Sequence, residues 1–139
     1  MTAKDYLSQA WRIDRVINAK LAQVRSLREL ATKATSTWSD IPPTGSRNFH
    51  RMEDIIVKIL DLESEINADI LSLVETKREI VHSIKAVNNE DYRTLLELRY
   101  LAFQSWDEIA HDLQYSKDHI FYLHRKALSE IKLTVKGVE

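Results

Sequence analysis

The stretch Ser105–Ile131 reads SWDEIAHDLQYSKDHIFYLHRKALSEI and contains two short helical patterns separated by a three-residue turn. Ser105 stands three residues before Glu108, which is the spacing of a capping box at the start of a helix. Ser116 is placed to cap a second helix in the same way. This order predicts a helix-turn-helix, with helices over 106–113 and from 117 to about 135.

The rest of the chain contains few residues that break helices. Its 139 residues include 2 Gly, 2 Pro and no Cys, and Pro42, Pro43 and Gly45 stand together. So few turn residues argue against a β-sandwich, a β-barrel or an α/β enzyme with glycine-rich phosphate loops. The absence of Cys excludes a disulfide framework, a thiolate zinc site and a cysteine nucleophile. The composition therefore predicts an all-α protein with one loop, at about 35–49.

Two long segments show the spacing of coiled coils. Residues 3–34 and 50–87 both carry apolar residues at alternating steps of four and three. Joined by the loop at about 35–49, they predict a long antiparallel helical hairpin. The apolar stripe of the second segment is wide and needs more cover than one partner helix gives, so we expect a homodimer formed through the hairpin. The predicted domains are the hairpin, 1–87, and a helix-turn-helix domain, 88–139.

Each long segment has a polar residue within its apolar stripe. Lys20 interrupts the first stripe and Glu63 interrupts the second, and pairing residue 34 with about residue 52 brings the two interruptions near each other. We hypothesise that a Lys20–Glu63 ion pair fixes the register of the hairpin. Two solvated side chains at the edge of the seam fit the same spacing.

The tryptophans raise further expectations. Trp38 and Ile41 precede the two prolines, where they would plug the open end of the hairpin or contact a partner. We expect Trp11 and Trp106 to lie in cores.

The second domain is predicted to begin with a helix of its own. Asn89 is a suitable cap, and Glu90 and Asp91 would place negative charge in the first turn. The helix would run to about residues 100–102 and bury four leucines: Leu95, Leu96, Leu98 and Leu101. Together with the two helices above, it completes a C-terminal three-helix unit.

Charge is nearly balanced overall but uneven along the chain. The net charge is −1. Residues 90–113 hold 2 Lys/Arg against 6 Asp/Glu, whereas residues 114–138 hold 5 against 2, with His119 and His124 in addition. The C-terminal end is therefore a local basic patch, which suits a nucleic-acid contact. No apolar run approaches the roughly 20 residues of a membrane span, and the first residues lack a signal-peptide pattern, so we expect a soluble cytoplasmic protein with no membrane partner.

A helix-turn-helix reads DNA with its second helix, whose N-terminal residues lead into the major groove. Five residues are thereby candidates for base contacts: Lys117, Asp118, His119, Phe121 and Tyr122. Further cations along the same helix are candidates for phosphate contacts: Arg125, Lys126, Lys132 and Lys136.

The segment Glu90–Leu133 resembles region four of bacterial sigma factors and related sigma-like regulators. Three motifs carry the resemblance at the family spacing without gaps: LELRY over 96–100, SWDEIA over 105–110 and LQYS over 113–116. The whole architecture is similar, more loosely, to small prophage transcription regulators of Gram-positive bacteria, of the ArpU/RinA type. The resemblance implies a phage-derived, sigma-like regulator that docks its last helix on double-stranded promoter DNA and contacts RNA polymerase.

The chain departs from the family pattern at two positions. Gln114 stands in the turn where many relatives carry Gly, and it would have to adopt the left-handed conformation at a cost of about 1 kcal/mol. Phe121 stands where relatives commonly carry a basic residue, and a phenyl ring offers a thymine methyl contact but no bidentate reading of a base.

Other interpretations of the same residues stay open. In one, the chain is a protein-binding module that contacts RNA polymerase or a phage partner without DNA, which an exposed apolar patch at Phe121 and Tyr122 would favour. In another, it is a structural coiled-coil linker, which requires the Lys117–Arg125 face to pack inward. His119 and His124 are five residues apart and do not share a helix face, so we predict no metal site. No arrangement of acids or of Ser, His and Asp indicates catalysis, and we predict neither an enzyme nor a cofactor.

Overall fold

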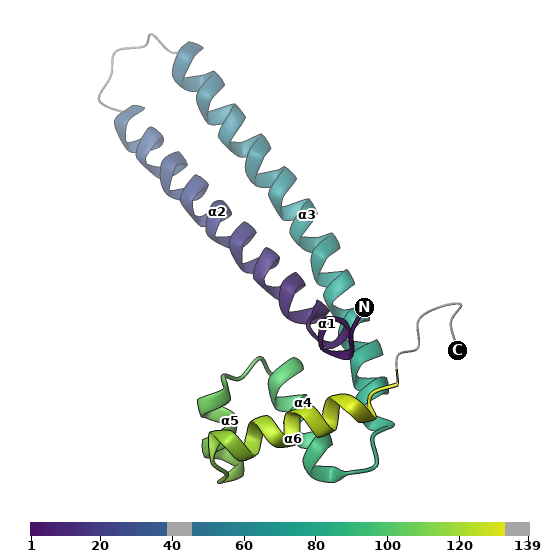
Figure 1. Ribbon diagram of the computed structural model, residues 1–139. Coiled ribbons are helices and arrows are strands. Elements are labelled where there is room, and N and C mark those ends of the chain that lie inside the picture. The colour runs from purple at the N-terminus through teal and green to yellow at the C-terminus, as the bar shows by residue number, and fades with distance from the viewer. Residues whose placement is uncertain (39–45, 133–139) are drawn as a thin grey trace. The chain divides into compact units, whose positions relative to one another are not determined.

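The computed structural model describes residues 1–38 and 46–132, with side chains over 1–33 and 50–132. The regular elements in these ranges are helices and none is a strand, which confirms the all-α prediction. Figure 1 labels them: α1 (Ala3–Leu7), α2 (Gln9–Trp38), α3 (Ser46–Lys85), α4 (Glu90–Tyr100), α5 (Trp106–Leu113) and α6 (Lys117–Glu130). No helix among them combines the length and the apolar character that crossing a membrane requires. The predicted plug depends on the side chains of Trp38 and Ile41 and the predicted phosphate contact on that of Lys136, and these three side chains lie outside those that the structure describes.

The chain divides into two compact units. One consists of Met1–Ile13 together with Leu73–Glu139, and the other is Asp14–Ser72. The sequence-based boundary at residue 87 follows chain order, whereas packing groups the first 13 residues with the C-terminal helices. The first unit is therefore built from both ends of the chain.

The core of the first unit is a single apolar cluster. α6 packs mainly on α4 and also contacts α5 and α1. Seven large side chains have less than 2% of their surface exposed: Leu7, Ile80, Ile84, Leu95, Leu96, Ile109 and Ile120. Burial of a side chain of this size contributes about 1.5–3 kcal/mol to folding before entropy is subtracted. The cluster thus provides the scaffold on which α5 and α6 are held.

The first predicted helix, 3–34, is interrupted near its start. Thr2 caps α1 by accepting a hydrogen bond from the Asp5 amide. At Ser8 the side-chain hydroxyl donates to the Lys4 carbonyl at 2.7 Å, and such back-bonding competes with the helical ladder. The chain resumes as α2 at Gln9.

Trp11 is not in a core, contrary to the expectation. It is 49% exposed, while the preceding Ala10 is fully buried. Successive helical residues are rotated by about 100°, so the residue after a buried position leaves the buried face.

The C-terminal helices begin where the sequence indicates, and one of them ends earlier. Asn89 caps α4 by accepting a hydrogen bond from the Tyr92 amide, and α5 spans the predicted 106–113. α6 ends at Glu130 rather than near residue 135. Ile131 adopts an extended conformation and its side chain is only 8% exposed, so burial of this residue in the core accompanies the end of the helix.

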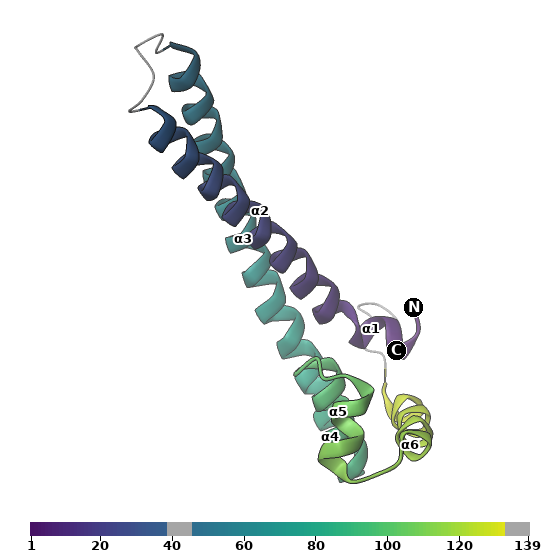
Figure 2. The ribbon, with the colours of Figure 1, turned by 90° about the vertical axis from the view of Figure 1, so that its left-hand side faces the viewer.

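In the unit Asp14–Ser72, α2 and α3 run side by side in opposite directions (Figures 1 and 2). Ile17 and Val24 from α2 and Ile59 and Ile66 from α3 are buried along the seam between them. Both helices extend further toward the connecting loop than predicted, to Trp38 and from Ser46. The Ser and Thr residues in these end turns favour caps and turns in isolation, which is why the sequence predicted too early an end for the first helix and too late a start for the second.

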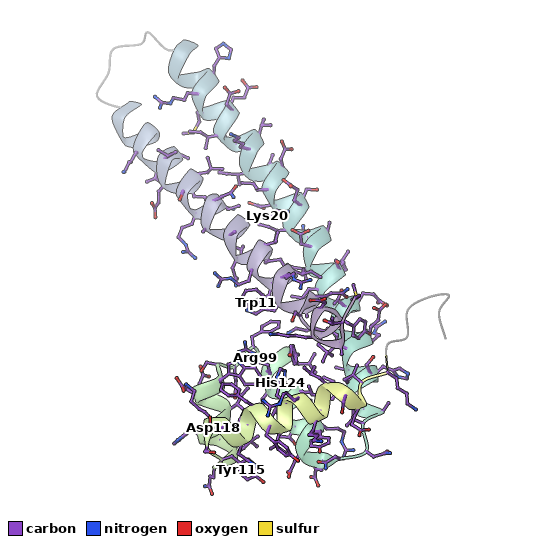
Figure 3. The ribbon with its side chains drawn as sticks, in the orientation of Figure 1. Trp11, Lys20, Arg99, Tyr115, Asp118 and His124 are labelled. Atoms are coloured by element: carbon purple, nitrogen blue, oxygen red, sulfur yellow. The ribbon has the colours of Figure 1, made fainter. Side chains whose placement is uncertain are left out.

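The predicted Lys20–Glu63 ion pair is wrong. Lys20 bridges Asp69 at 2.7 Å and Glu65 at 3.5 Å, while Glu63 accepts from Arg28 at 2.6 Å. Side chains on a helix lean toward its N-terminus. In an antiparallel pair the side chains of the two helices therefore lean in opposite directions. The Lys20 side chain points toward the C-terminal end of α3, and the Glu63 side chain points toward the C-terminal end of α2. Figure 3 shows Lys20 between the two helices.

Candidate nucleic-acid interface

The turn between α5 and α6 has well-defined hydrogen bonds at both helix ends. Gln114 ends α5 in the left-handed conformation, with φ 59° and ψ 39°. This is the conformation that the sequence predicted for Gln114 at the position where many relatives carry Gly. The amide of Tyr115 donates back to the Ala110 carbonyl at 3.1 Å, which is the long bond of a Schellman motif. Ser116 then caps α6 by accepting from the His119 amide at 3.2 Å. The turn therefore fixes the direction in which α6 leaves α5.

The start of α5 is capped as predicted, with one difference. Ser105 accepts a hydrogen bond from the Glu108 amide at 3.2 Å. The Glu108 carboxylate in turn accepts from the Ser105 hydroxyl at 3.1 Å, where the capping box predicts a bond to the Ser105 backbone. The acids Asp107 and Glu108 lie in the first turn, where the helix dipole favours negative charge.

One side of α6 is held by aromatic contacts with the helices beneath it. Phe121 is half-buried, and its ring meets the Trp106 ring edge to face, with the centroids 5.5 Å apart. The Arg99 guanidinium also lies over the Trp106 ring, 4.3 Å from its centroid. Part of the Phe121 side chain thus packs α6 on α5, whereas the sequence predicted that Phe121 contacts a base.

His124 lies on the buried side of α6. Its Nε2 is 2.6 Å from the Tyr100 hydroxyl, and its ring meets Trp106 edge to face at 4.6 Å. Burial, reinforced by Lys4, Arg99 and Arg125, lowers the pKa of His124 to about 4. Burial also raises the pKa of Tyr100 to about 12. Since His124 is neutral at pH 7, it adds no charge to the basic C-terminal end with which the sequence grouped it.

The opposite side of α6 carries most of the predicted contact residues. Side chains exposed there include Lys117, Asp118, His119, Tyr122, Arg125 and Lys126. Figure 3 shows Asp118 and Tyr115 near the turn, at the outer end of α6, and His124 within the helical cluster. The Lys117–Arg125 face is therefore directed outward, so the condition for the coiled-coil linker interpretation is not met.

Lys117 has an ion-pair partner that the sequence did not indicate. Its ammonium lies 2.8 Å from the Asp107 carboxylate of α5, and both side chains are more than half exposed. An exposed pair of this kind is weak and can exchange for another anion. Arg125 and Lys126 are exposed further along α6, and Lys132 is exposed but lies beyond Glu130, the last residue of the helix, and not along it as predicted.

An exposed aromatic column follows the same face. Tyr115 and His119 meet edge to face at 4.6 Å, His119 stacks toward Tyr122 at 6.1 Å, and the Lys126 ammonium lies 5.7 Å from the Tyr122 ring centroid. We call Tyr115, His119, Tyr122 and Lys126 the aromatic column. Sequence reasoning missed Tyr115, because it lies in the turn before the Ser116 cap and not on α6, whereas the steps of three and four from His119 to Tyr122 and Lys126 place those three on one helix face.

The described residues contain no group of three or more His, Asp or Glu side chains arranged to hold a metal ion.

A family model described as a protein of unknown function, DUF1492, matches residues 33–132. This range contains α3 to α6 and includes the whole outward face of α6. No curated protein and no solved structure matches the chain.

Proposed function

The chain belongs to the DUF1492 family, and we propose that it is a DNA-binding transcription regulator in which α5 and α6 form a helix-turn-helix. In this proposal a long helical hairpin precedes a C-terminal three-helix unit, and α6 docks in the major groove. The observation that carries the proposal is the outward face of α6, on which the three cations of the helix, Lys117, Arg125 and Lys126, are exposed.

The proposed roles follow from position along α6. Lys117, Asp118, His119 and Tyr122 lie in the first half, which leads into the groove in a helix-turn-helix. Tyr122 offers a ring for a thymine methyl and a hydroxyl for a base edge. Phe121 supports this surface from behind through Trp106.

The remaining cations suit the phosphate backbone. Arg125, Lys126 and Lys132 are exposed and carry no sequence information by themselves. Their contribution is charge neutralisation, which makes binding strongly dependent on salt. Lys117 joins them when DNA phosphate replaces Asp107 as its partner.

The resemblance of 90–133 to sigma region four supports a more specific version of the proposal. In that version the DNA is promoter DNA, RNA polymerase is a protein partner, and the regulator is phage-derived and acts in the cytoplasm. No metal, cofactor or catalytic group is needed, because docking alone performs the function.

DNA affinity of the full-length chain tests the proposal. Random-sequence duplexes are selected for binding, and the enriched duplex is titrated at several salt concentrations. We expect Arg125→Ala to weaken binding and to reduce the salt slope by about one. Asp107→Asn is expected to tighten binding, because it releases Lys117 and removes a negative charge beside the DNA.

Arg78→Ala is the matched control, since it also removes one exposed cation from the same unit, but from α3 and not from the helix-turn-helix. Its affinity and salt slope should equal those of the wild type. Failure to enrich any duplex, or an equal effect of Arg78→Ala and Arg125→Ala, would reject DNA binding by this face.

A second candidate function is supported by the aromatic column. Exposed aromatic rings beside the acidic Asp118 also suit a protein contact, and the chain would then bind RNA polymerase or a phage protein without DNA. The two candidates differ in one measurable respect. A protein-binding module would lose partner binding on Tyr122→Ala and show no salt-dependent affinity for any duplex.

A further inference from the structure

A stripe of exposed aliphatic side chains runs along α3 within the unit Asp14–Ser72. Ile56, Leu60 and Leu71 are separated by four and eleven residues, so they lie on one face of the helix. Val57 and Ile70 flank this line. The exposed fractions of Ile56, Val57, Leu60, Ile70 and Leu71 are 48%, 51%, 60%, 43% and 72%. We call these five residues the α3 stripe.

The α3 stripe is separate from the seam with α2. The seam residues Ile59 and Ile66 are 8% and 5% exposed. Leu60 follows Ile59 directly, so the stripe is rotated by about 100° from the seam. α2 therefore cannot cover it, and α3 has a second apolar face besides the one that α2 uses.

A shallow groove between the two helices adjoins the stripe. Its volume is about 290 Å³, and it is lined by Leu21, Val24, Arg28, Glu63, Ile66 and Asn67. Glu63 lies three residues from Leu60 and Asn67 lies four residues from Leu71, so the groove and the stripe form one surface. Leu21, 43% exposed, extends the apolar character onto α2. Contiguous exposed apolar surface of this kind marks a protein contact.

The charges of the two helices indicate which protein fits. In α2, residues 14–33 contain five Lys/Arg against Asp14 and Glu29. In α3, residues 50–72 contain Arg51 and Lys58 against six Asp/Glu. A partner helix of one sign would match only one of these two helices. A second copy matches both, because each copy supplies a basic and an acidic helix.

We propose that the α3 stripe is the interface at which two copies of this chain pair. A twofold axis parallel to the helices brings stripe against stripe and places the basic α2 of each copy next to the acidic α3 of the other. A perpendicular axis would also bring stripe against stripe, but it would place α2 against α2, so no basic helix of one copy would lie next to an acidic helix of the other. The interface is isologous and therefore closes at two copies. This inference goes beyond the proposed function, since it concerns a unit that does not contain α6.

Sedimentation equilibrium of the full-length chain tests the proposal. The wild type should be a concentration-dependent dimer. Leu60→Glu should raise the dimer dissociation constant by about tenfold or more, because dimerisation would bury an unpaired carboxylate. Leu30→Glu is the matched control: it is the same change at a leucine that is 48% exposed, on the side of α2 turned away from the groove. It should leave the dissociation constant unchanged.

Leu71→Glu provides a second variant in the stripe, and far-UV circular dichroism verifies that each variant keeps its helix content. A dimer weakened by Leu60→Glu and Leu71→Glu but not by Leu30→Glu supports the interface. A wild-type chain that stays monomeric throughout the measured concentration range overturns it. A dimer that neither stripe variant weakens more than Leu30→Glu overturns it as well.

Discussion

His124 is a titratable side chain within the core of the C-terminal helices, where it is 8% exposed. Its ring is enclosed by Tyr100 from α4 and Trp106 from α5, and three cations raise the positive potential around it: Lys4, Arg99 and Arg125. Burial and these three cations make a further positive charge unfavourable at this place, so the native structure keeps the imidazole neutral at pH 7. The short bond to the Tyr100 hydroxyl then joins α6 to α4 through an uncharged polar pair.

This arrangement predicts that the chain loses stability in mild acid. The pKa of His124 is lowered from 6.5 to about 4 on folding, so the unfolded state binds more protons between these two pH values. Stability from this group is therefore complete above pH 6.5 and declines as the pH falls to 4. The shift corresponds to a loss on the order of 3 kcal/mol. Urea unfolding at a series of pH values measures it.

His124→Gln is the control for this prediction, because glutamine can still accept from Tyr100 but does not titrate. The variant should still lose stability where carboxylates are protonated. It should not show the loss of unfolding free energy that protonation of His124 causes between pH 6.5 and 4. If the wild type and the variant lose stability in parallel through this range, His124 is not the source.

The burial of His124 was available from the sequence but was overlooked. It is four residues after Ile120 and three before Ala127, so it shares a helix face with two apolar residues that are both buried. The grouping of His124 with the basic end relied on residue type rather than on position. By contrast, no sequence pattern predicts the left-handed conformation of Phe103, with φ 59°, because Phe rarely adopts this conformation.

At the scale of helices, the sequence predicted the helix N-termini that carry a polar cap, but it did not predict which side chains pair between two helices. Ser105, Asn89 and Ser116 cap their helices as the sequence indicates, because a cap depends on residues only three positions apart. The register of α2 against α3 depends on side-chain direction over many turns. The Lys20–Glu63 hypothesis compared only the positions of the two backbones along the hairpin axis. It neglected the direction of the side chains, and it therefore selected the wrong carboxylate.

The observed register predicts the outcome of a double-mutant cycle. Lys20 combines a hydrogen bond and an ion pair with Asp69, which raise the pKa of its ammonium group. Lys20→Met and Asp69→Asn should therefore couple in urea unfolding, and added salt should reduce the coupling. The matched cycle of Lys20→Met with Glu63→Gln should give none. Coupling with Glu63 and not with Asp69 would restore the register first inferred from the sequence.

At the scale of the whole molecule, the sequence predicted the two sets of helices but not how packing divides them. The heptad spacing of 3–34 and 50–87 is continuous, so it contains no sign that one unit gives way to the other between Ile13 and Asp14 and again between Ser72 and Leu73. Periodicity identifies which face of a helix is apolar. It does not identify what covers that face, and here the C-terminal helices cover the first turns of the chain.

This division predicts that a substitution near the N-terminus loosens the candidate DNA-binding helices. Leu7 is fully buried in the same cluster as Leu96, Ile109 and Ile120. Leu7→Ala should destabilise the first unit by roughly 2–5 kcal/mol, because truncation leaves a cavity as well as losing apolar burial. Hydrogen exchange followed by mass spectrometry should then show faster exchange in α4 to α6, more than 80 residues away in sequence. Leu30→Ala, at an exposed leucine of α2, is the control and should leave exchange in α6 unchanged. If Leu7→Ala accelerates exchange in α1 alone, the N-terminal helix is an attachment to the core of the first unit and not part of it.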